Sequence, residues 1–343
     1  MQLGKRIRVL VVDDSIVFRE VLSRGISSDP NIEVVATATD PFDARDKIIQ
    51  FEPDVMTCDV EMPRMNGIEF IRRLMPQYPL PVIVVSTVNS AVFDAMNAGA
   101  IDFVTKPDVR SVKNVENFIN EMIVKVKIAS TANVLHWNTV GSSNKIISNI
   151  NAYINKIIAV GASTGGTEAI YNVLKHLPKS IPGIVIVQHI PPDFSRMFAE
   201  RLNTSTALQV KEARTGDYIE QGHVLVAPGD QHMRIIRVGN KYRVECFKGD
   251  KLNGHCPSVD ILFESVAKEA GSQAIGIILT GMGYDGAKGL LLMRRKGART
   301  IGQDESSSVV YGMPKVAFNI GAVEKQVSLD KISKLIYSLL AEG

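Results

Sequence analysis

Three residues that could form a hydrolytic centre stand at the ends of three predicted strands: Ser163, His189 and Asp285. A serine hydroxyl is a poor nucleophile until an imidazole accepts its proton. The imidazole in turn needs a carboxylate that fixes its tautomer and stabilises its charged form. The three residue types together therefore favour acyl transfer by a serine hydrolase. Their order along the chain matches none of the common hydrolase orders, which disfavours the ordinary α/β-hydrolase fold.

Ser163 lies in a glycine-rich turn at residues 161–166 (GASTGG), between an apolar strand at 157–160 and a helix at 168–177. Such a turn lifts the hydroxyl clear of the backbone, because the neighbouring glycines have no Cβ to clash there. The N-terminus of the following helix offers unpaired N–H groups that suit an anion or an oxyanion. Taken alone, the pattern also fits a plain glycine-rich turn or a phosphate-binding loop.

The other two residues strengthen the hydrolase interpretation. Of the six histidines, only His189 ends a strong apolar strand, at residues 183–188. Asp285 follows the predicted strand at 274–280 in a glycine-flanked turn, where it could also be an ordinary turn aspartate. Because three suitable groups end three strands, we favour the catalytic triad.

A second set of strand-end residues lies in the N-terminal third of the chain: Asp13, Asp14, Asp59, Ser86 and Lys106. Three converging carboxylates would repel one another unless a divalent cation lay among them, and Mg²⁺ prefers such oxygen ligands. The metal and the Lys106 ammonium would neutralise charge on a phosphoryl group while one carboxylate attacks it. The alternative, that these aspartates cap helices, accounts for Asp14 alone.

Alternating strands and helices must position both sets of residues. In the first part we predict strands at 7–12, 33–38, 54–58, 82–85 and 102–105, with helices at 17–26 and 41–50. In the second part we predict strands at 157–160, 183–188, 221–229, 274–280 and 300–302, a hairpin of 233–238 with 242–246, and helices at 168–177, 259–269, 287–296 and 329–340. Such alternation predicts parallel sheets, whose functional residues gather at the carboxyl ends of the strands.

The composition excludes several classes of protein. With 343 residues, 45% hydrophobic and 22% charged, the chain has room for two or three globular domains. A net charge of +3 is too small to predict binding to nucleic acid or to a membrane surface. The cysteines at 58, 246 and 256 are too widely spaced for a disulfide framework or a zinc site. We see no signal peptide and no membrane-length apolar run, so we expect a cytoplasmic location.

A polar linker is predicted at residues 128–155. This stretch has no acidic residue, several asparagines and the short run Gly141-Ser142-Ser143, which is typical of weak structure. Trp137, the only tryptophan, lies within it and could pack between domains or be incidental. We therefore place one domain at residues 1–127 and a second at residues 156–343.

The first domain resembles the response-regulator receiver family. The resemblance rests on Asp13-Asp14, residues 59–67 (DVEMPRMNG), Ser86 and Lys106-Pro107. It implies that Asp59 is the phosphoacceptor and that Mg²⁺ is held by Asp13, Asp14, Asp59 and the backbone carbonyl of Glu61. It further implies a phosphorylation switch formed by Ser86, Lys106 and Phe103. The segment 87–98 looks short for this family, so we expect an abbreviated fourth helix.

The second domain resembles the chemotaxis protein-glutamate methylesterases, a family that joins a receiver to an esterase. The resemblance rests on residues 161–166 (GASTGG), 188–189 (QH), 227–229 (APG), 257–260 (PSVD), 280–286 (TGMGYDG) and 311–314 (YGMP). It implies that Ser163, His189 and Asp285 form the triad. Thr164 and Met282 would lie beside it, with the Met282 N–H as an oxyanion donor.

Together the two resemblances imply a fold, a function and partners. The fold would be two doubly wound parallel-sheet domains, a flavodoxin-like receiver and a three-layer α/β esterase. The function would be phosphorylation-activated removal of methyl groups from glutamate γ-methyl esters on chemotaxis receptors, with deamidation of receptor glutamines. The partners would be receptor cytoplasmic domains as substrate and a chemotaxis histidine kinase as phosphodonor. We expect Mg²⁺ in the receiver, no cofactor for ester hydrolysis, no nucleic-acid partner and no membrane insertion.

Other functions are weaker. A response regulator whose output domain only binds a partner is the main alternative, and trapping of Ser163 by a serine-directed reagent would separate the two. A DNA-binding regulator is disfavoured, since the second domain shows neither a basic recognition helix nor marked positive charge. A nucleotide-dependent oxidoreductase is disfavoured because residues 161–166 lack the G-x-G-x-x-G spacing and the next strand ends in His189 rather than an acid.

Overall fold

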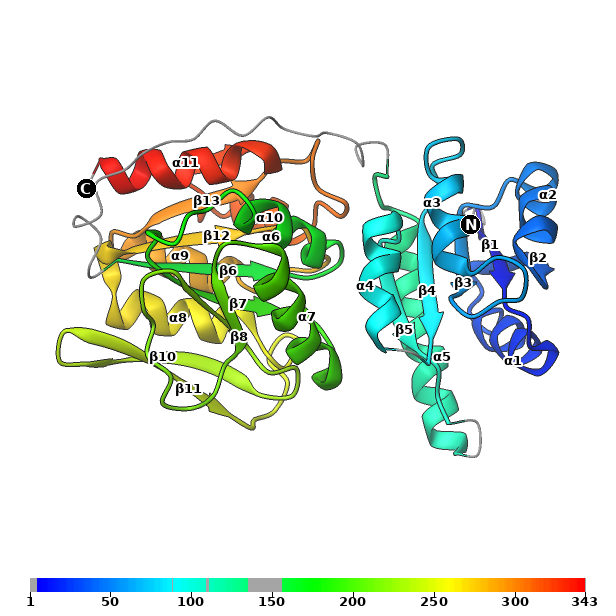
Figure 1. Ribbon diagram of the computed structural model, residues 1–343, viewed down its shortest axis with the longest axis horizontal. Helices are drawn as coiled ribbons and strands as arrows, with labels where there is room; N and C mark the ends of the chain where they lie inside the picture. Colours follow the sequence, from blue (N-terminus) through cyan, green and yellow to red (C-terminus); the bar gives the residue numbers. More distant parts are fainter. Residues whose placement is uncertain (1–4, 88, 109–110, 135–155, 343) are drawn as a thin grey trace. The chain divides into compact units, whose positions relative to one another are not determined.

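The computed structural model describes residues 5–87, 89–108, 111–134 and 156–342, which fall into two compact units. The first unit holds the residues before 135 and the second holds those from 156 onward (Figure 1). Most of the predicted linker lies outside the described residues, Trp137 included. Among the described residues, no helix combines the length and apolar character needed to cross a bilayer.

The first unit is a five-stranded parallel sheet in the order β2-β1-β3-β4-β5. This order is that of flavodoxin-like folds, so the predicted class of the first domain is confirmed. Helices α1 and α5 pack together, as do α3 and α4. The strands are β1 (Ile7–Val12), β2 (Ile32–Ala38), β3 (Val55–Asp59), β4 (Val82–Ser86) and β5 (Asp102–Thr105), and the helices are α1 (Ile16–Ile26), α2 (Pro41–Phe51), α3 (Gly67–Leu74), α4 (Asn89–Ala98) and α5 (Val112–Ala129).

Helix α4 has 10 residues, and its expected shortness relative to the family stays a prediction. The end of helix α5 differs from expectation. Helix α5 continues to Ala129, past the predicted start of the linker at residue 128, because its buried stripe runs on through Val126 and Ala129.

The second unit is a seven-stranded parallel sheet in the order β14-β13-β12-β6-β7-β9-β8, with an antiparallel pair formed by β10 and β11. Helices α6 and α11 pack together, and α8 packs on α9 against the strands β6 and β12 (Figure 1). The strands are β6 (Ile157–Ala162), β7 (Gly183–Gln188), β8 (Gln209–Glu212), β9 (His223–Val226), β10 (His232–Val238), β11 (Lys241–Phe247), β12 (Ala274–Ile278), β13 (Arg299–Gln303) and β14 (Lys325–Val327). The helices are α6 (Gly166–Leu174), α7 (Pro192–Ser205), α8 (Val259–Glu269), α9 (Ala287–Arg295), α10 (Met313–Asn319) and α11 (Leu329–Ala341), with a 3₁₀ turn η1 (Gly271–Gln273). The predicted doubly wound α/β class is confirmed here too.

The three central strands of this sheet are buried along their whole length, because β6, β7 and β12 are continuous apolar runs. Continuous rather than alternating apolar sequence is typical of parallel strands covered by helices on both faces. These are the strands whose carboxyl ends lead to Ser163, His189 and Asp285. The fold therefore brings the three residues to one edge of the sheet.

Candidate active site and phosphoacceptor site

The three triad candidates lie where the winding of the second sheet reverses. In the sheet, β7, β9 and β8 lie in that order on one side of β6, whereas β12, β13 and β14 lie on the other. The loops that follow the neighbouring strands β6 and β12 lead to opposite sides of the sheet, and ligands bind in the crevice at such a point. Ser163 directly follows β6, His189 directly follows β7, and Asp285 lies in the loop after β12.

The turn that carries Ser163 is closely packed. The Ser163 N–H donates to the Thr280 carbonyl at 3.0 Å, and the Ser163 carbonyl accepts from the Gly166 N–H at 2.7 Å. Gly165 has a φ of 75°, a left-handed conformation that favours glycine. A Cβ on Gly281 would lie 2.6 Å from the Ser163 Cβ, so the β12 loop can approach this close only through a glycine. Ser163 itself remains half-buried and open to solvent.

His189 is bonded at one ring nitrogen and free at the other. Its Nε2 donates to Asp285 Oδ2 at 2.9 Å, and its side chain is 8% exposed. Its Nδ1 is buried and makes no hydrogen bond within the described residues, nor does the Ser163 hydroxyl. Because the carboxylate holds the proton on Nε2, the lone pair resides on Nδ1 and is available to accept a proton.

Asp285 is buried and held by five hydrogen bonds. Burial opposes its ionisation, but the hydrogen bond from His189 and the other donors outweigh burial and hold the pKa of Asp285 well below its usual value. Two donors are backbone N–H groups at the start of α8, where the helix dipole also favours a negative charge. The donors are His189 Nε2 at 2.9 Å, Asn253 Nδ2 at 3.0 Å, Ser258 Oγ at 2.8 Å, Val259 N at 2.7 Å and Asp260 N at 3.2 Å.

Sequence reasoning assigned no role to Asn253 or Ser258, although both bind Asp285. Ser258 could have been found, since it precedes α8 at the N-cap position and lies within the PSVD motif. Its hydroxyl makes no cap hydrogen bond and is directed to Asp285 instead. Asn253 gave no such signal, because it lies in a loop and reaches Asp285 only through the tertiary fold. Its amide also donates to Asp260 Oδ2 at 2.8 Å.

The two predicted neighbours of the triad differ in exposure. Thr164 is 7% exposed, and its carbonyl accepts from the Thr280 hydroxyl at 3.0 Å. Met282 is 46% exposed, and its backbone N–H donates to no group in the part of the chain that the structure describes. The preceding residue, Gly281, uses its own N–H on the Val310 carbonyl. The Met282 N–H is therefore free to receive an oxyanion.

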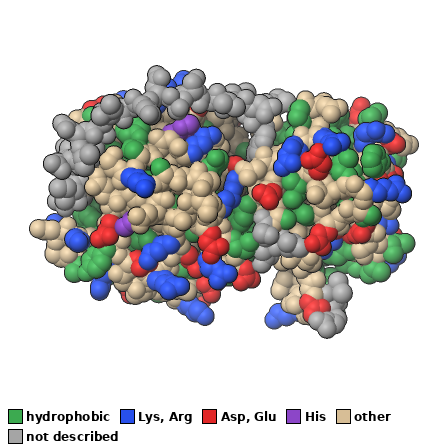
Figure 2. All heavy atoms as spheres, in the orientation of Figure 1, with side chains coloured by type: hydrophobic (Ala, Val, Ile, Leu, Met, Phe, Trp, Pro, Cys, Tyr) green, Lys and Arg blue, Asp and Glu red, His purple; other side chains and the backbone are tan. Residues whose placement is uncertain are grey.

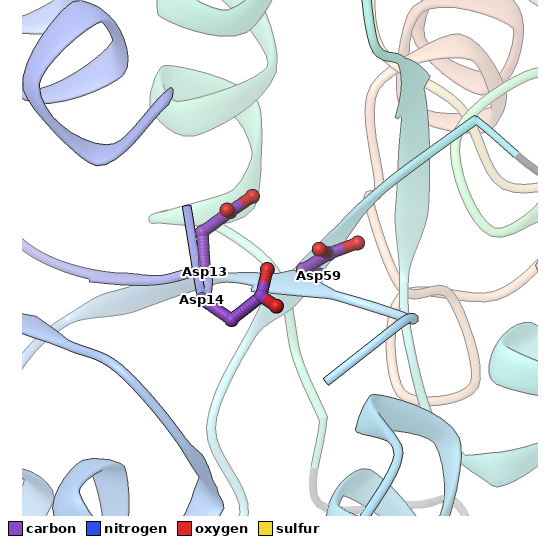
Figure 3. Close-up of side chains that lie close together, drawn as sticks. All are labelled: Asp13, Asp14 and Asp59. Carbon is purple, nitrogen blue, oxygen red and sulfur yellow. The ribbon is translucent and has the colours of Figure 1, made fainter. Parts of the chain in front are cut away.

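The first unit brings three carboxylates together at the carboxyl ends of β1 and β3. Asp13, Asp14 and Asp59 each offer an oxygen, and these oxygens lie within 4.8 Å of one another (Figure 3). Lys106 Nζ lies 2.7 Å from Asp13 Oδ2 and 2.7 Å from Asp59 Oδ2. One ammonium leaves an excess of negative charge among three carboxylates. The all-oxygen donor set and this excess fit a hard divalent cation.

Asp59, the predicted phosphoacceptor, is buried beside Asp13 at the carboxyl end of β3. It is 4% exposed, and burial raises its pKa despite the hydrogen bond from Lys106. The Glu61 N–H donates to Asp59 Oδ1 at 3.3 Å, so the Glu61 peptide lies at the acid cluster. Ser86 and Phe103, the other predicted switch residues, are buried on the neighbouring strands β4 and β5. The Lys106 N–H donates to the Ser86 carbonyl at 3.1 Å.

On the visible face, Lys and Arg side chains are interspersed with Asp and Glu on both units (Figure 2). This mixture is what a net charge of +3 predicts.

The folds and sites define a class of protein: a response regulator whose output unit has the active-site architecture of a serine hydrolase. Comparison with known families gives the particular one. Residues 158–336 match the family model described as CheB methylesterase, and residues 9–116 match the response regulator receiver domain. The chain belongs to the CheB methylesterase family.

Curated relatives from several bacteria match along almost the whole chain. A protein-glutamate methylesterase/protein-glutamine glutaminase of Syntrophomonas wolfei is 57% identical over 338 residues, which cover 98% of each chain. A protein of the same name from Salmonella typhimurium is 45% identical over 342 residues, again 98% of each chain. The crystal structure of the Thermotoga maritima CheB methylesterase catalytic domain is 37% identical, with a TM-score of 0.53; the match covers 54% of this chain and 98% of that one.

Proposed function

We propose that this protein hydrolyses glutamate γ-methyl esters on chemotaxis receptors, and deamidates receptor glutamines, through Ser163, His189 and Asp285. The curated relatives carry both activities in their name, protein-glutamate methylesterase/protein-glutamine glutaminase. One observation carries the assignment of residues. A buried histidine is held by a carboxylate at Nε2, keeps Nδ1 free, and follows the strand adjacent to the one that leads to a serine.

The geometry suggests how the ester bond is cleaved. The Ser163 hydroxyl attacks the ester carbonyl carbon while its proton passes to His189 Nδ1. The Met282 N–H stabilises the oxyanion of the tetrahedral intermediate. When the intermediate collapses, the C–O bond to the methoxy group breaks and His189 returns the proton, so that methanol departs. Asp285 remains ionised and stabilises the imidazolium.

A second half-reaction restores the enzyme. Water attacks the acyl carbon and gives a proton to His189 Nδ1. Collapse of this second intermediate breaks the bond to Ser163, which takes the proton back, and the receptor glutamate is released. With a glutamine substrate the same steps expel ammonia in place of methanol. Both reactions need the acyl-enzyme to be open to water, which agrees with the half-buried position of Ser163.

The receiver would control this chemistry by phosphorylation of Asp59. Asp13, Asp14, Asp59 and the Glu61 carbonyl would hold Mg²⁺, which neutralises charge on the phosphoryl group. Lys106 supplies the protein's own positive charge at the same point, 2.7 Å from Asp59 Oδ2. We propose that Ser86, Lys106 and Phe103 transmit the change, since Ser86 ends β4, the strand next to β3, while Phe103 lies on β5 and Lys106 directly follows it.

The remaining parts of the proposal concern partners, domain limits and location. A chemotaxis histidine kinase would supply the phosphoryl group, and receptor cytoplasmic domains would supply the ester. The receiver would occupy residues 1–127, a linker residues 128–155 and the esterase residues 156–343. A cytoplasmic location follows from a substrate and a phosphodonor that are both presented inside the cell.

The test is methanol release from a methyl-esterified receptor fragment. We expect release by the wild-type protein, faster with a small-molecule phosphodonor and Mg²⁺. Ser163→Ala and His189→Gln should lose activity by several orders of magnitude, because the triad acts as a unit. A serine-directed phosphonylating reagent should label Ser163 and block release. Near-normal turnover by Ser163→Ala would overturn the assignment.

A further inference from the structure

A second histidine lies flat against the candidate catalytic base. The rings of His255 and His189 have centroids 3.7 Å apart and planes 7° apart, a stacked arrangement. Within the described residues the His255 ring makes no hydrogen bond of its own. Among the described residues, the aromatic contact of the His255 ring is with the face of the His189 ring.

We propose that His255 is a positioning residue for the base, acting through its flat ring face to hold the His189 imidazole in the plane needed for proton transfer. This inference rests on the proposed triad. The reason is geometric. The His189 ring has a single hydrogen bond, from Nε2 to Asp285. One hydrogen bond leaves the ring free to rotate about the line that joins the donor and acceptor atoms. Such rotation would move Nδ1 away from the Ser163 hydroxyl. A flat partner 3.7 Å away removes that freedom.

The loop between β11 and α8 is built to keep His255 in place. Leu252 and His255 exchange two backbone hydrogen bonds, at 3.0 Å and 2.9 Å, which closes a tight turn. Asn253 within that turn is anchored to Asp285 and Asp260. The end of the loop is tied down because the Ser258 N–H donates to His232 Nδ1 at 3.2 Å. The loop thus binds both members of the His189–Asp285 pair, one through a ring face and one through an amide.

Charge also suits this role. Burial, with the neighbouring His189, lowers the pKa of His255 from 6.5 to about 4, so its ring is neutral at neutral pH. The charged or titratable groups facing it are His189 from the end of β7, Asp285 from the β12 loop and Lys251 from its own loop. When His189 takes the serine proton, it meets a neutral π face, which stabilises a cation better than a second imidazolium would.

The experiment compares two replacements of His255 in the full-length protein. His255→Phe keeps a flat ring without nitrogens, whereas His255→Leu keeps a similar volume without a flat ring. We expect the Leu variant to lower kcat roughly ten- to a hundredfold with KM within about twofold, as for a misplaced catalytic group. The Phe variant should recover most of that loss. Labelling of Ser163 by a phosphonylating reagent should slow in parallel, which tests the base without receptor docking.

Controls separate the possible failures. His223→Leu removes a half-buried histidine at the amino end of β9, the edge away from the site, and should leave kcat unchanged. If the Leu variant is unfolded by circular dichroism, His255→Asn takes its place. Wild-type kcat in both the Leu and Phe variants, or equal losses in both, would overturn the stacking role. Ser163→Ala is assayed alongside, and activity there would instead overturn the proposed function.

Discussion

Asp285 is the most heavily bonded side chain of the site, and its bonds explain how a buried carboxylate stays charged. Five donors surround it, two of them backbone N–H groups at the start of α8. Each donor lowers the energy of the ionised form, and together they overcome the cost of burial. The carboxylate can therefore hold the proton on His189 Nε2 throughout the reaction without taking the proton itself.

We expect Asp285→Asn to lower kcat by about 10³–10⁴-fold, because an amide can donate to Nε2 and so favour the wrong tautomer of His189. Ser258→Ala removes one of the five donors and leaves the charge, so it should cost only about tenfold, in line with about 1.5 kcal/mol for a hydrogen bond to a charged group. Methanol release at saturating substrate measures both. Equal losses of kcat in the two variants would show that the hydrogen bond from Ser258, and not the charge of Asp285, makes the larger contribution to catalysis.

The lowered pKa of His255 predicts a pH dependence of stability. Below pH 6.5 His255 binds a proton in the unfolded chain, whereas in the folded protein it stays neutral until the pH nears about 4. Stability from this group is therefore complete above pH 6.5 and is lost as the pH falls through about 4. We expect the urea midpoint to fall between about pH 7 and about pH 5, and to fall less in His255→Phe. Circular dichroism measures the urea midpoint of each protein. An equal fall of the midpoint in the wild type and in His255→Phe would contradict this prediction.

At the scale of elements, the loop after β12 must pass unusually close to the turn after β6. Gly281 makes this approach possible: a Cβ there would lie 2.5 Å from Met313 Sδ and 2.6 Å from Ser163 Cβ. Both distances are shorter than real Cβ contacts allow. The start of α8 is a third segment at this point, and its backbone N–H groups bind Asp285. Three short segments, rather than one, set the position of the nucleophile relative to the base.

We expect Gly281→Ala to lower kcat about a hundredfold or more, because the methyl group displaces Ser163 or the Met282 N–H. Gly239→Ala is the matched control. Gly239 lies in the β10–β11 turn at φ 61°, with nothing within 4 Å of a Cβ, so the change strains the backbone without touching the site. Its kcat should match the wild type. Methanol release and thermal melting of both variants measure the effect, and full activity in Gly281→Ala would refute the close approach.

At the scale of the whole molecule, the two units carry separate chemistry on the same kind of sheet edge. Each is a parallel sheet whose carboxyl ends carry the candidate reactive groups, the acids in the first and the proposed triad in the second. Phosphorylation at Asp59 can raise esterase activity only by shifting an equilibrium between a less active and a more active state of the protein. It can do so only if it stabilises the more active state more than the less active one. Control is thus a property of the intact chain.

We expect Asp59→Asn to keep the basal rate of ester hydrolysis and to lose its stimulation by a small phosphodonor. In the wild type, we expect EDTA to abolish the stimulation and leave the basal rate, because we propose that the acid cluster holds a divalent cation and that the triad works without one. Methanol release with and without phosphodonor measures both effects. Stimulation that survives in Asp59→Asn would place the phosphoacceptor elsewhere.

Much of this was predictable because it depends on local sequence. Buried parallel strands appear as short apolar runs, so β1, β5, β7 and the ends that follow them were located closely. The hairpin of β10 and β11 was predicted from its two-residue turn, and Val238 indeed pairs with Lys241. The order of strands in a doubly wound sheet then brings their ends together, so Ser163, His189 and Asp285 could be grouped without coordinates.

Other elements have no comparable pattern in the sequence. Strand β14 has three residues and strand β8 has four, and both lie at edges of the sheet, where apolar runs are short. Helix α10 is seven residues long and was not predicted either. Such elements form because the sheet and its helices offer a surface for them, which no local pattern records.

What the sequence by itself determined is which residue types reach the sheet edge, because strand ends and turns are set by neighbouring residues. What only the tertiary structure decided is how those residues are held. The bond from His189 Nε2 rather than Nδ1, the amide of Asn253 and the stacked ring of His255 all depend on where the loop before α8 returns. That return is fixed by packing between segments distant in the chain, and sequence periodicity carries no information about such contacts.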